Sequence, residues 1–213
     1  MSDKNTAPDS SDNSPAKKNY HHGDLYQSLL KSATEMIGEG GVAALSMRKL
    51  ADRVGVSRTA PYHHFKDKNE LLCAIAEQGF ADQEQIVGMI PAHNKTLDGR
   101  ALFALYVQAY IQFADKNPQQ YDLMFGRDIW KNGCPTPSLT EVSRRSFQRW
   151  LSWVETLQQQ GVLSNNDSAL RTAQITWATL HGLCRLINDG IYTERSNLEE
   201  MSRTAVRMLL TTQ

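Results

Sequence analysis

The sequence predicts an all-α protein in which a small N-terminal domain of three helices precedes a larger helical domain. From Asp24 almost to the end of the chain, apolar residues recur three and four positions apart, which is the spacing of one helix face. Clusters of Gly, Pro, Asn and Ser separate these segments, and no run of residues has the alternating pattern of a strand. Three short predicted helices followed by longer ones favour two helical domains over a single bundle.

The composition is that of a globular protein without strong overall charge. The chain has 213 residues, of which 40% are hydrophobic, and its 23 Lys and Arg balance 23 Asp and Glu. Any attraction to nucleic acid or to a membrane must therefore come from local charge. Cys73, Cys134 and Cys184 form no metal-type pair, and residues 1–16 lack the features of a signal peptide. We expect free thiols, a cytoplasmic protein and no membrane partner.

The first two predicted helices follow a polar tail. Residues 1–19 are rich in Ser, Asp, Asn and Pro and are expected to form a disordered tail. The first helix begins at Asp24 and ends at the glycines of positions 38–41. A second, short helix is predicted from Met47 to Val54. Ser46 is placed to cap its start, and the glycine at position 55 permits the positive φ that ends it.

A third helix and a longer connecting helix follow directly. We expect the third helix from Arg58 to about Phe65, capped by Ser57, with Pro61 tolerated near its first turn. Asp67 is followed three residues later by Glu, which resembles a capping box and predicts a connecting helix over residues 67–88. The later helices are predicted at residues 100–116, 118–125, 139–160, 169–188 and 198–210. The predicted domains are residues 20–66 and residues 67–213.

The segment from Leu50 to Ser57 has the pattern of a helix-turn-helix motif: a helix, a tight glycine turn and a newly capped helix. The first turn of the second helix of such a motif faces base edges in the major groove of DNA. Arg58 and Thr59 occupy that turn, and both side chains have groups that hydrogen-bond to bases. Between Lys17 and Leu71, nine basic residues outnumber six acidic ones. Double-stranded DNA is therefore the predicted partner.

Residues 46–72 resemble the DNA-binding domain of the tetracycline-repressor (TetR) family, and the resemblance extends over about residues 20–80. The glycine turn, the Tyr-x-His-Phe signature and the following Lys are present as Gly55, Tyr62, His64, Phe65 and Lys68. Pro61 differs from the aliphatic residue that many members have there. The resemblance implies that phosphates are bound by Ser46, Arg48, Tyr62, His63 and Lys68 and that bases are read by Arg58 and Thr59. Ser57, a hydroxyl at a helix start, completes the predicted DNA-binding set.

The second half of the chain is similar to one subgroup of that family. Trp177 followed by His181 and Gly182 resembles the subgroup's Trp…His-Gly motif. The resemblance implies a homodimeric regulator with a C-terminal dimerisation and ligand-binding domain. It predicts a repressor that binds a pseudo-palindromic operator and is released by a small-molecule effector. The alternative is an architectural or adaptor protein that binds DNA and has no effector.

Two residue sets are candidates for the C-terminal functions, although each would also be expected in an ordinary core. Effector pockets combine apolar and aromatic walls with a few polar groups. The effector candidates are Tyr106, Tyr110, Phe125, Trp150, Trp153, Trp177 and His181. The last two predicted helices have more apolar positions than a helix pair at the chain end leaves exposed. The dimer-interface candidates are Ile175, Leu180, Leu183, Ile187, Met201, Met208 and Leu209.

Several residues have a second interpretation. Tyr62 is compatible with packing as well as with phosphate contact, and the interpretation of His64 as a residue that bridges helices is favoured. The basic run from Lys17 to His22 is either a minor-groove arm or a solvated stretch. His181 and Cys184 are two donors without a third, so packing is favoured over metal binding. No nucleophile elbow, phosphate loop or metalloprotease motif occurs, so we expect no enzyme, metal or cofactor.

Overall fold

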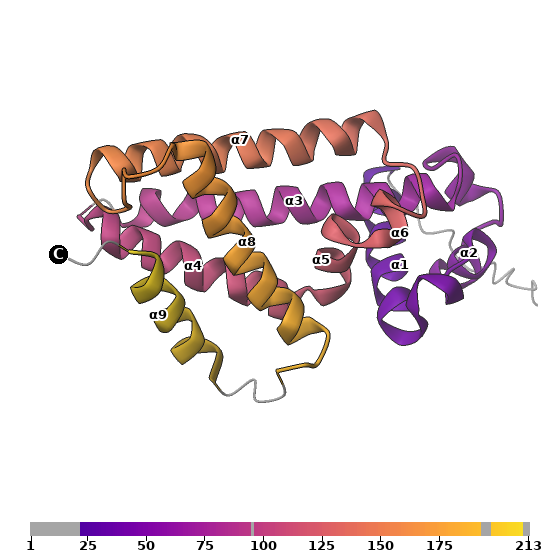
Figure 1. The fold of residues 1–213 in the computed structure, drawn as a ribbon. Coiled ribbons are helices and arrows are strands. Elements are labelled where there is room, and N and C mark those ends of the chain that lie inside the picture. The colour runs from indigo at the N-terminus through magenta and orange to yellow at the C-terminus, as the bar shows by residue number, and fades with distance from the viewer. Residues whose placement is uncertain (1–21, 95, 193–196, 211–213) are drawn as a thin grey trace, which may run out of the picture.

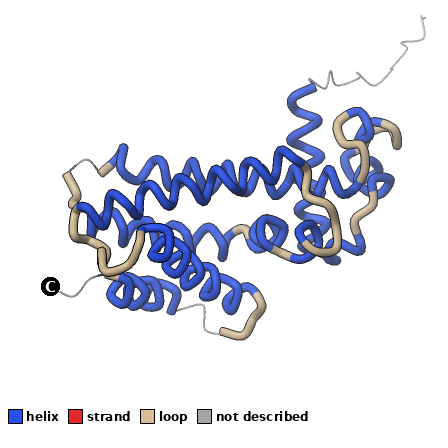
Figure 2. Tube along the Cα trace, turned by 45° about the horizontal axis from the view of Figure 1, so that its top comes forward, coloured by secondary structure: helices blue, strands red, loops and turns tan. Residues whose placement is uncertain are grey.

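The computed structural model describes residues 22–94, 96–192 and 197–210, and this part of the chain is helical and contains no strand (Figures 1 and 2). The helices are α1 (His22–Ala44), α2 (Met47–Val54), the 3-10 helix η1 (Ala60–His63), α3 (Lys68–His93), α4 (Gly99–Lys116), α5 (Pro118–Phe125), α6 (Arg127–Trp130), α7 (Pro137–Gln159), α8 (Ala169–Asn188) and α9 (Leu198–Leu209). The predicted all-α fold is confirmed. The predicted tail over residues 1–19 lies outside the described residues, and so does the candidate arm from Lys17 to His22, except for His22 at the start of α1.

The helix-turn-helix region begins as the sequence predicts. The side chain of Ser46 accepts a hydrogen bond from the backbone N–H of Lys49 at 3.2 Å, which caps α2. Gly55 ends α2 in the left-handed conformation, with φ at 77° and ψ at 33°, and its N–H donates to Ala51. Leu50 and Ala51 on the inner face of α2 are fully buried against α1. The spacing of these apolar residues and the two caps account for α2 and for the sharp turn that follows it.

The third predicted helix differs from the prediction. In place of an α-helix from Arg58 to Phe65, the structure has a 3-10 helix of four residues, η1. Pro61 provides the physical reason: it has no N–H to donate to the carbonyl of Ser57. That carbonyl instead accepts from the N–H of Ala60, only three residues on, at 2.9 Å. Ser57 is not the cap that the sequence predicts, because η1 begins after Thr59 without any side-chain cap.

The connecting helix is longer than predicted. A side-chain oxygen of Asp67 accepts from the N–H of Glu70 at 2.9 Å, and Glu70 in turn accepts from the N–H of Lys66, so a reciprocal cap starts α3. The helix then continues past the predicted end near residue 88 to His93. It therefore runs without interruption from the small N-terminal domain through the C-terminal domain (Figure 1).

The C-terminal domain packs in layers around α3. Figure 1 shows α7 lying lengthwise along one side of α3 and α4 along another, and these helices are in contact. Helices α8 and α9 form a further layer, where both contact α4 and α8 also contacts α7. The helix pairs enclose a core rich in aromatic residues, among which Phe103, Tyr110 and Tyr121 are almost completely buried. The short α6, which the sequence did not predict, follows α5 at the end nearest the small domain (Figure 1).

We expect substitution by alanine to have opposite effects on stability at two glycines. Gly55→Ala should lower the free energy of unfolding by roughly 1–2 kcal/mol, because Ala is strained in the left-handed conformation of this turn. Gly88→Ala should raise it by roughly 0.5–1 kcal/mol, because Gly88 lies inside α3 and an added Cβ meets nothing within 4 Å. Urea unfolding followed by circular dichroism at a fixed protein concentration measures both changes. Shifts of the same sign in the two variants would contradict this account.

Candidate DNA-binding surface and effector cavity

The predicted base-reading and phosphate-binding residues form one exposed surface on the turn before η1 and on η1 itself. Ser57, Arg58, Thr59, Tyr62 and His63 are all exposed. Tyr62 leaves 55% of its surface exposed, which is more than a tyrosine with only a packing role requires. By contrast, the neighbouring Phe65 is 2% exposed and packs with its ring centroid 5.2 Å from that of Tyr26. The motif therefore presents its polar residues outward around one buried aromatic anchor.

Arg58 is held loosely at the edge of this surface. Its Nε lies 3.8 Å from a carboxylate oxygen of Asp52, and both side chains are largely solvent-exposed. Exposed ion pairs at this distance are weak, so the guanidinium is accessible to another acceptor. The hydroxyl oxygens of Ser57 and Thr59 lie 3.1 Å apart, which leaves further hydrogen-bonding capacity on each. This turn thus offers one guanidinium and two hydroxyls to a ligand.

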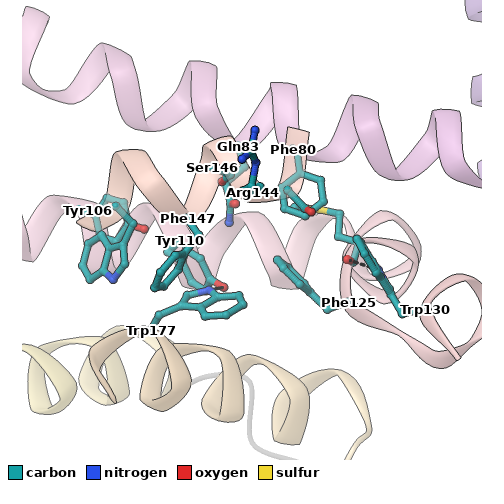
Figure 3. A pocket seen from close by; sticks show the side chains of 13 residues that line it. Phe80, Gln83, Tyr106, Tyr110, Phe125, Trp130, Arg144, Ser146, Phe147 and Trp177 are labelled. Atoms are coloured by element: carbon teal, nitrogen blue, oxygen red, sulfur yellow. Dashed lines mark hydrogen bonds between the residues drawn. The ribbon is translucent and has the colours of Figure 1, made fainter. Parts of the chain in front are cut away.

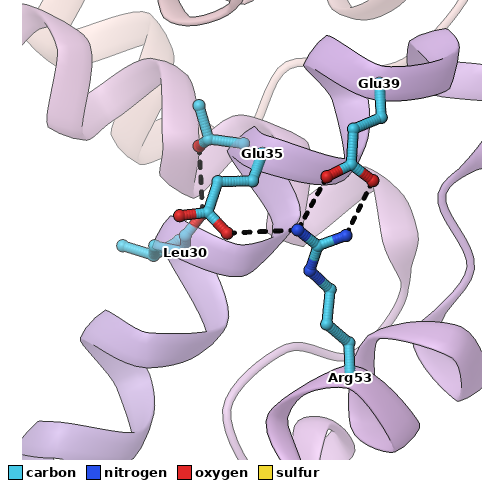
Figure 4. A network of polar contacts seen from close by, with 5 residues as sticks. Leu30, Glu35, Glu39 and Arg53 are labelled. Carbon is cyan, nitrogen blue, oxygen red and sulfur yellow. Dashed lines mark hydrogen bonds and ion pairs between the residues drawn. The ribbon is translucent and has the colours of Figure 1, made fainter.

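Arg53 fastens α2 to α1 and is not part of the predicted contact surface (Figure 4). Its guanidinium donates two hydrogen bonds of 2.7 Å to Glu39 and one of 3.3 Å to Glu35. These hydrogen bonds raise the pKa of Arg53, and the same interaction lowers the pKa of Glu39. The two glutamates lie 14 and 18 residues before Arg53 in the chain. The sequence shows the opposite charges, but it does not predict which residues pair.

Lys68 has a hydrogen-bond partner within the protein, and its predicted phosphate contact stays a prediction. Its Nζ donates a hydrogen bond to the backbone carbonyl of Val42, near the end of α1, and the side chain is partly buried. The ammonium therefore already satisfies a carbonyl at the end of a helix, where cations are favoured. Ser46 likewise uses its oxygen to cap α2, which leaves its O–H proton available for donation. Arg48 is exposed at the start of α2, as a phosphate-binding residue must be.

Five of the seven effector candidates surround one cavity in the C-terminal domain (Figure 3). The five are Tyr106, Tyr110, Phe125, Trp150 and Trp177. The cavity has a volume of about 330 Å³ and lies between α3, α4, α7 and α8, with α5 and α6 at one end. This volume is at the small end of the range of about 300–1,000 Å³ that is typical of ligand pockets. The remaining two candidates, Trp153 and His181, lie elsewhere.

Trp153 lines a second cavity of about 280 Å³. The two cavities have four lining residues in common: Gln83, Tyr106, Ser146 and Trp150. Of these, Gln83 on α3 was not predicted, because a single Gln in a helix gives no sign from sequence that it faces inward. Gln83 is only 8% exposed, and its side-chain Nε2 has no hydrogen-bond partner. An unpaired amide N–H is thus placed at the junction of the two cavities.

His181 lies behind the cavity wall and does not line the main cavity. Trp177 Nε1 donates to the hydroxyl of Tyr110 at 3.0 Å, and that hydroxyl lies 3.1 Å from the hydroxyl of Tyr121. The Tyr121 hydroxyl in turn lies 2.8 Å from Nδ1 of His181. Burial and then the nearby Arg185 lower the pKa of His181, which favours the neutral ring. This hydrogen-bonded chain fixes the orientation of the Trp177 ring at the cavity.

The dimer-interface candidates divide into two groups. Ile175 is 65% exposed and Met208 is 79% exposed. Leu183, Met201, Met208 and Leu209 also line a hollow of about 880 Å³ between α8 and α9. In contrast, Leu180 and Ile187 are 0% and 2% exposed and belong to the core of the protomer. Because these two side chains are buried inside the protomer, assigning them to an interface is wrong.

Within residues 22–94, 96–192 and 197–210, no three His, Cys, Asp or Glu side chains are grouped so that they could hold a metal ion. Cys184 is buried beside the hydrogen-bonded chain, which raises the pKa of its thiol to about 12. None of the described helices is both long and apolar enough to cross a membrane.

The chain is similar to proteins that regulate transcription. The HTH-type transcriptional activator FasR of Mycolicibacterium smegmatis is 33% identical over 100 residues, which cover 47% of this chain and 45% of FasR. The tetracycline repressor protein class A from transposon 1721, of Escherichia coli, is 43% identical over 54 residues, a quarter of each chain. The matched segments thus span less than half of the length of these curated relatives.

Solved structures extend the similarity to the whole fold. A protein of unknown function from Rhodococcus sp. RHA1 is 30% identical, with a TM-score of 0.71, and the match covers 92% of this chain and all of that chain. The fatty acid degradation regulator FadR from Bacillus halodurans is 14% identical with a TM-score of 0.71 over 89% of this chain and 96% of its own, and it shows the fold alone.

Two family models match the chain, one in each domain. The first, described as bacterial regulatory proteins of the tetR family, matches residues 29–75. The second, described as a tetracyclin repressor-like C-terminal domain, matches residues 103–209. The narrower subgroup that rests on Trp177 and His181 stays a prediction. Since both domains match, the chain belongs to the tetR family of bacterial regulatory proteins.

Proposed function

We propose that the protein is a ligand-released transcriptional repressor that binds a pseudo-palindromic operator in the cytoplasm as a homodimer. The observation that carries the proposal is the exposed surface on and before η1, where Arg58, Thr59 and Tyr62 stand outward around the buried Phe65. The side chains of these residues can donate hydrogen bonds to bases and phosphates. Arg58 and Thr59 lie directly after the glycine turn, and Tyr62 lies on η1. Family membership supports the same conclusion.

Dimerisation follows from the exposed apolar face of the last two helices. Ile175 and Met208 are large side chains that water solvates poorly, and they flank a hollow lined by Leu183 and Met201. A two-fold axis would place α8 and α9 of one protomer on the same helices of its partner and would bury this patch. The symmetry of such a dimer matches the symmetry of a palindromic operator.

Release by a ligand is supported by the cavity that α3 shares with α4, α7 and α8. The same helix begins beside η1, so a change in its packing reaches the DNA-binding surface. An adaptor without an effector would have no use for a cavity of about 330 Å³ whose wall contains the unpaired amide of Gln83. We therefore favour the ligand-responsive repressor over the adaptor.

The first functional prediction separates base reading from phosphate binding. The operator is first selected from genomic fragments. On this DNA, Arg58→Ala should weaken the binding free energy by about 1–3 kcal/mol and should reduce the base preference at one base pair in each half-site. Arg48→Ala should weaken the binding of all DNA sequences by the same factor. It should also reduce the steepness of log affinity against log salt concentration by about one. Fluorescence anisotropy over a range of salt concentrations measures both effects.

Arg127→Ala provides the matched control, because Arg127 is an exposed arginine on α6 in the C-terminal domain. It should leave affinity and base preference unchanged. Lys68 is unsuitable for this comparison, since its loss would also remove the hydrogen bond to Val42. If Arg58→Ala kept the base preference of the wild type, the assignment of Arg58 would be wrong.

The second functional prediction concerns the interface. Met208→Glu combined with Ile175→Glu should give a folded monomer, because both side chains are exposed in the protomer and charges would oppose the apolar contact. Operator affinity should fall by a factor on the order of 100, as the two half-sites are no longer bound together. Sedimentation velocity and anisotropy measure the two effects.

Met89→Glu is the control, since Met89 is an exposed methionine on α3, away from α8 and α9. It should remain dimeric and should bind the operator as the wild type does. A wild-type protein that sediments as a monomer at micromolar concentration would overturn the proposed interface.

A further inference from the structure

The two cavities of the C-terminal domain are neighbours and have part of their walls in common. Gln83, Tyr106, Ser146 and Trp150 line both, and the volumes are about 330 and 280 Å³. Phe125 and Trp130 lie at one end of the first cavity, as Figure 3 shows, whereas Trp153 lines the second cavity. A ligand in the larger cavity therefore lies against the four shared residues.

The charges of the cavity region are already paired. Arg144 pairs with Glu141 at 2.6 Å, and both side chains are more than half exposed, so this pair belongs to the surface. Arg149 of the second cavity pairs with Glu84. No charged side chain among the described lining residues is thus left to compensate a buried charge on a ligand. An uncharged occupant is favoured, because an isolated buried charge is costly.

One polar group of the wall does require a partner. The Nε2 of Gln83 is buried, and no acceptor among the described residues lies within hydrogen-bonding distance of it. The Gln83 side chain interacts with the nearby Tyr110 hydroxyl, but the hydrogen bonds of that hydroxyl are made with Trp177 and Tyr121. A buried donor without a partner is unfavourable, and a ligand acceptor beside it would remove that cost. The occupant is therefore expected to carry a hydrogen-bond acceptor at the position of Gln83.

The remaining wall is aromatic. Beside Met124 and the polar residues, the first cavity is lined by Phe80, Tyr106, Tyr110, Phe125, Trp130, Phe147, Trp150 and Trp177. Tyr106 and Trp150 already stack, with ring centroids 4.8 Å apart and an interplanar angle of 17°. Flat rings fit such walls by offset stacking and by edge-to-face contacts. An aliphatic chain would gain neither.

We propose that this cavity binds an uncharged, planar aromatic molecule of two or three fused rings, and that Gln83 donates a hydrogen bond to its acceptor group. The inference deepens the proposed function, because it rests on the same effector cavity. Gln83 is then the residue that determines ligand specificity. The rings of Tyr106, Trp150 and Trp177 supply the contact area.

The test compares two probes of nearly the same shape. Methyl naphthyl ketone has a carbonyl oxygen as acceptor, whereas ethylnaphthalene has a CH2 group in place of that carbonyl. Isothermal titration calorimetry with the full-length protein should show the ketone binding about tenfold more tightly than the hydrocarbon, as one net hydrogen bond allows. In Gln83→Met, which keeps the length of the side chain and removes the amide, this preference should fall to within about twofold.

Gln85→Met is the matched control, since Gln85 is an exposed glutamine two residues later on α3. It should keep the tenfold preference. The proposal is overturned by equal binding of the two probes to the wild type, by a preference that survives in Gln83→Met, or by tighter binding of dodecanoate than of the ketone. The absence of binding by both naphthyl probes would overturn it as well.

Operator affinity without any probe is measured separately. Failure of both probes together with normal operator binding would reject the ligand class and leave the DNA-binding regulator standing. Loss of operator binding together with normal Gln83-dependent probe binding would reject the regulator and support the cavity assignment. The two proposals can therefore fail independently.

Discussion

The continuity of α3 is the constraint on which the rest of the structure depends. Its 26 residues extend about 39 Å at 1.5 Å per residue, from the first turn after the DNA-binding surface to the far end of the C-terminal domain. Near its start, Lys68 is tied to the carbonyl of Val42 in α1. Further along, Gln83 faces the cavity, and α4, α5 and α7 pack on its sides. A single helix therefore connects the small domain with the cavity.

This continuity defines what a ligand must do to release DNA. A ligand changes operator affinity only if it binds the DNA-bound and the free conformations with different affinities, and the coupling is reciprocal. Groups that are unsatisfied in one conformation are a physical source of such a difference. The amide of Gln83 is one such group, because its hydrogen bond would form only with a ligand acceptor in place. Its position on α3 places that difference on the helix that reaches η1.

The sequence predicts most of the elements because caps and apolar spacing are local signals. Ser46, Gly55 and Asp67 act where they were expected to act. Sequence patterns are less informative where a residue distant in the chain, or the lack of a backbone N–H, determines the local structure. Pro61 converts an expected α-helix into η1, and no local pattern predicts the hydrogen bond from Lys68 to a carbonyl 26 residues away. The aromatic cavity residues were identifiable by type, whereas Gln83 was not, because a polar residue on a helix usually faces water.

The faces of α8 connect the cavity with the proposed interface. Ile175 is exposed, Trp177 two residues later lines the cavity, and Leu180 three residues after that is buried in the core. Successive residues turn by about 100° around a helix, so these three side chains point in three directions from one rigid element. A ligand that shifts Trp177 moves the same helix that carries Ile175. Because a dimer on a palindromic operator must keep its two recognition elements about 34–36 Å apart, a small rotation of α8 in the proposed dimer would weaken the fit to both half-sites.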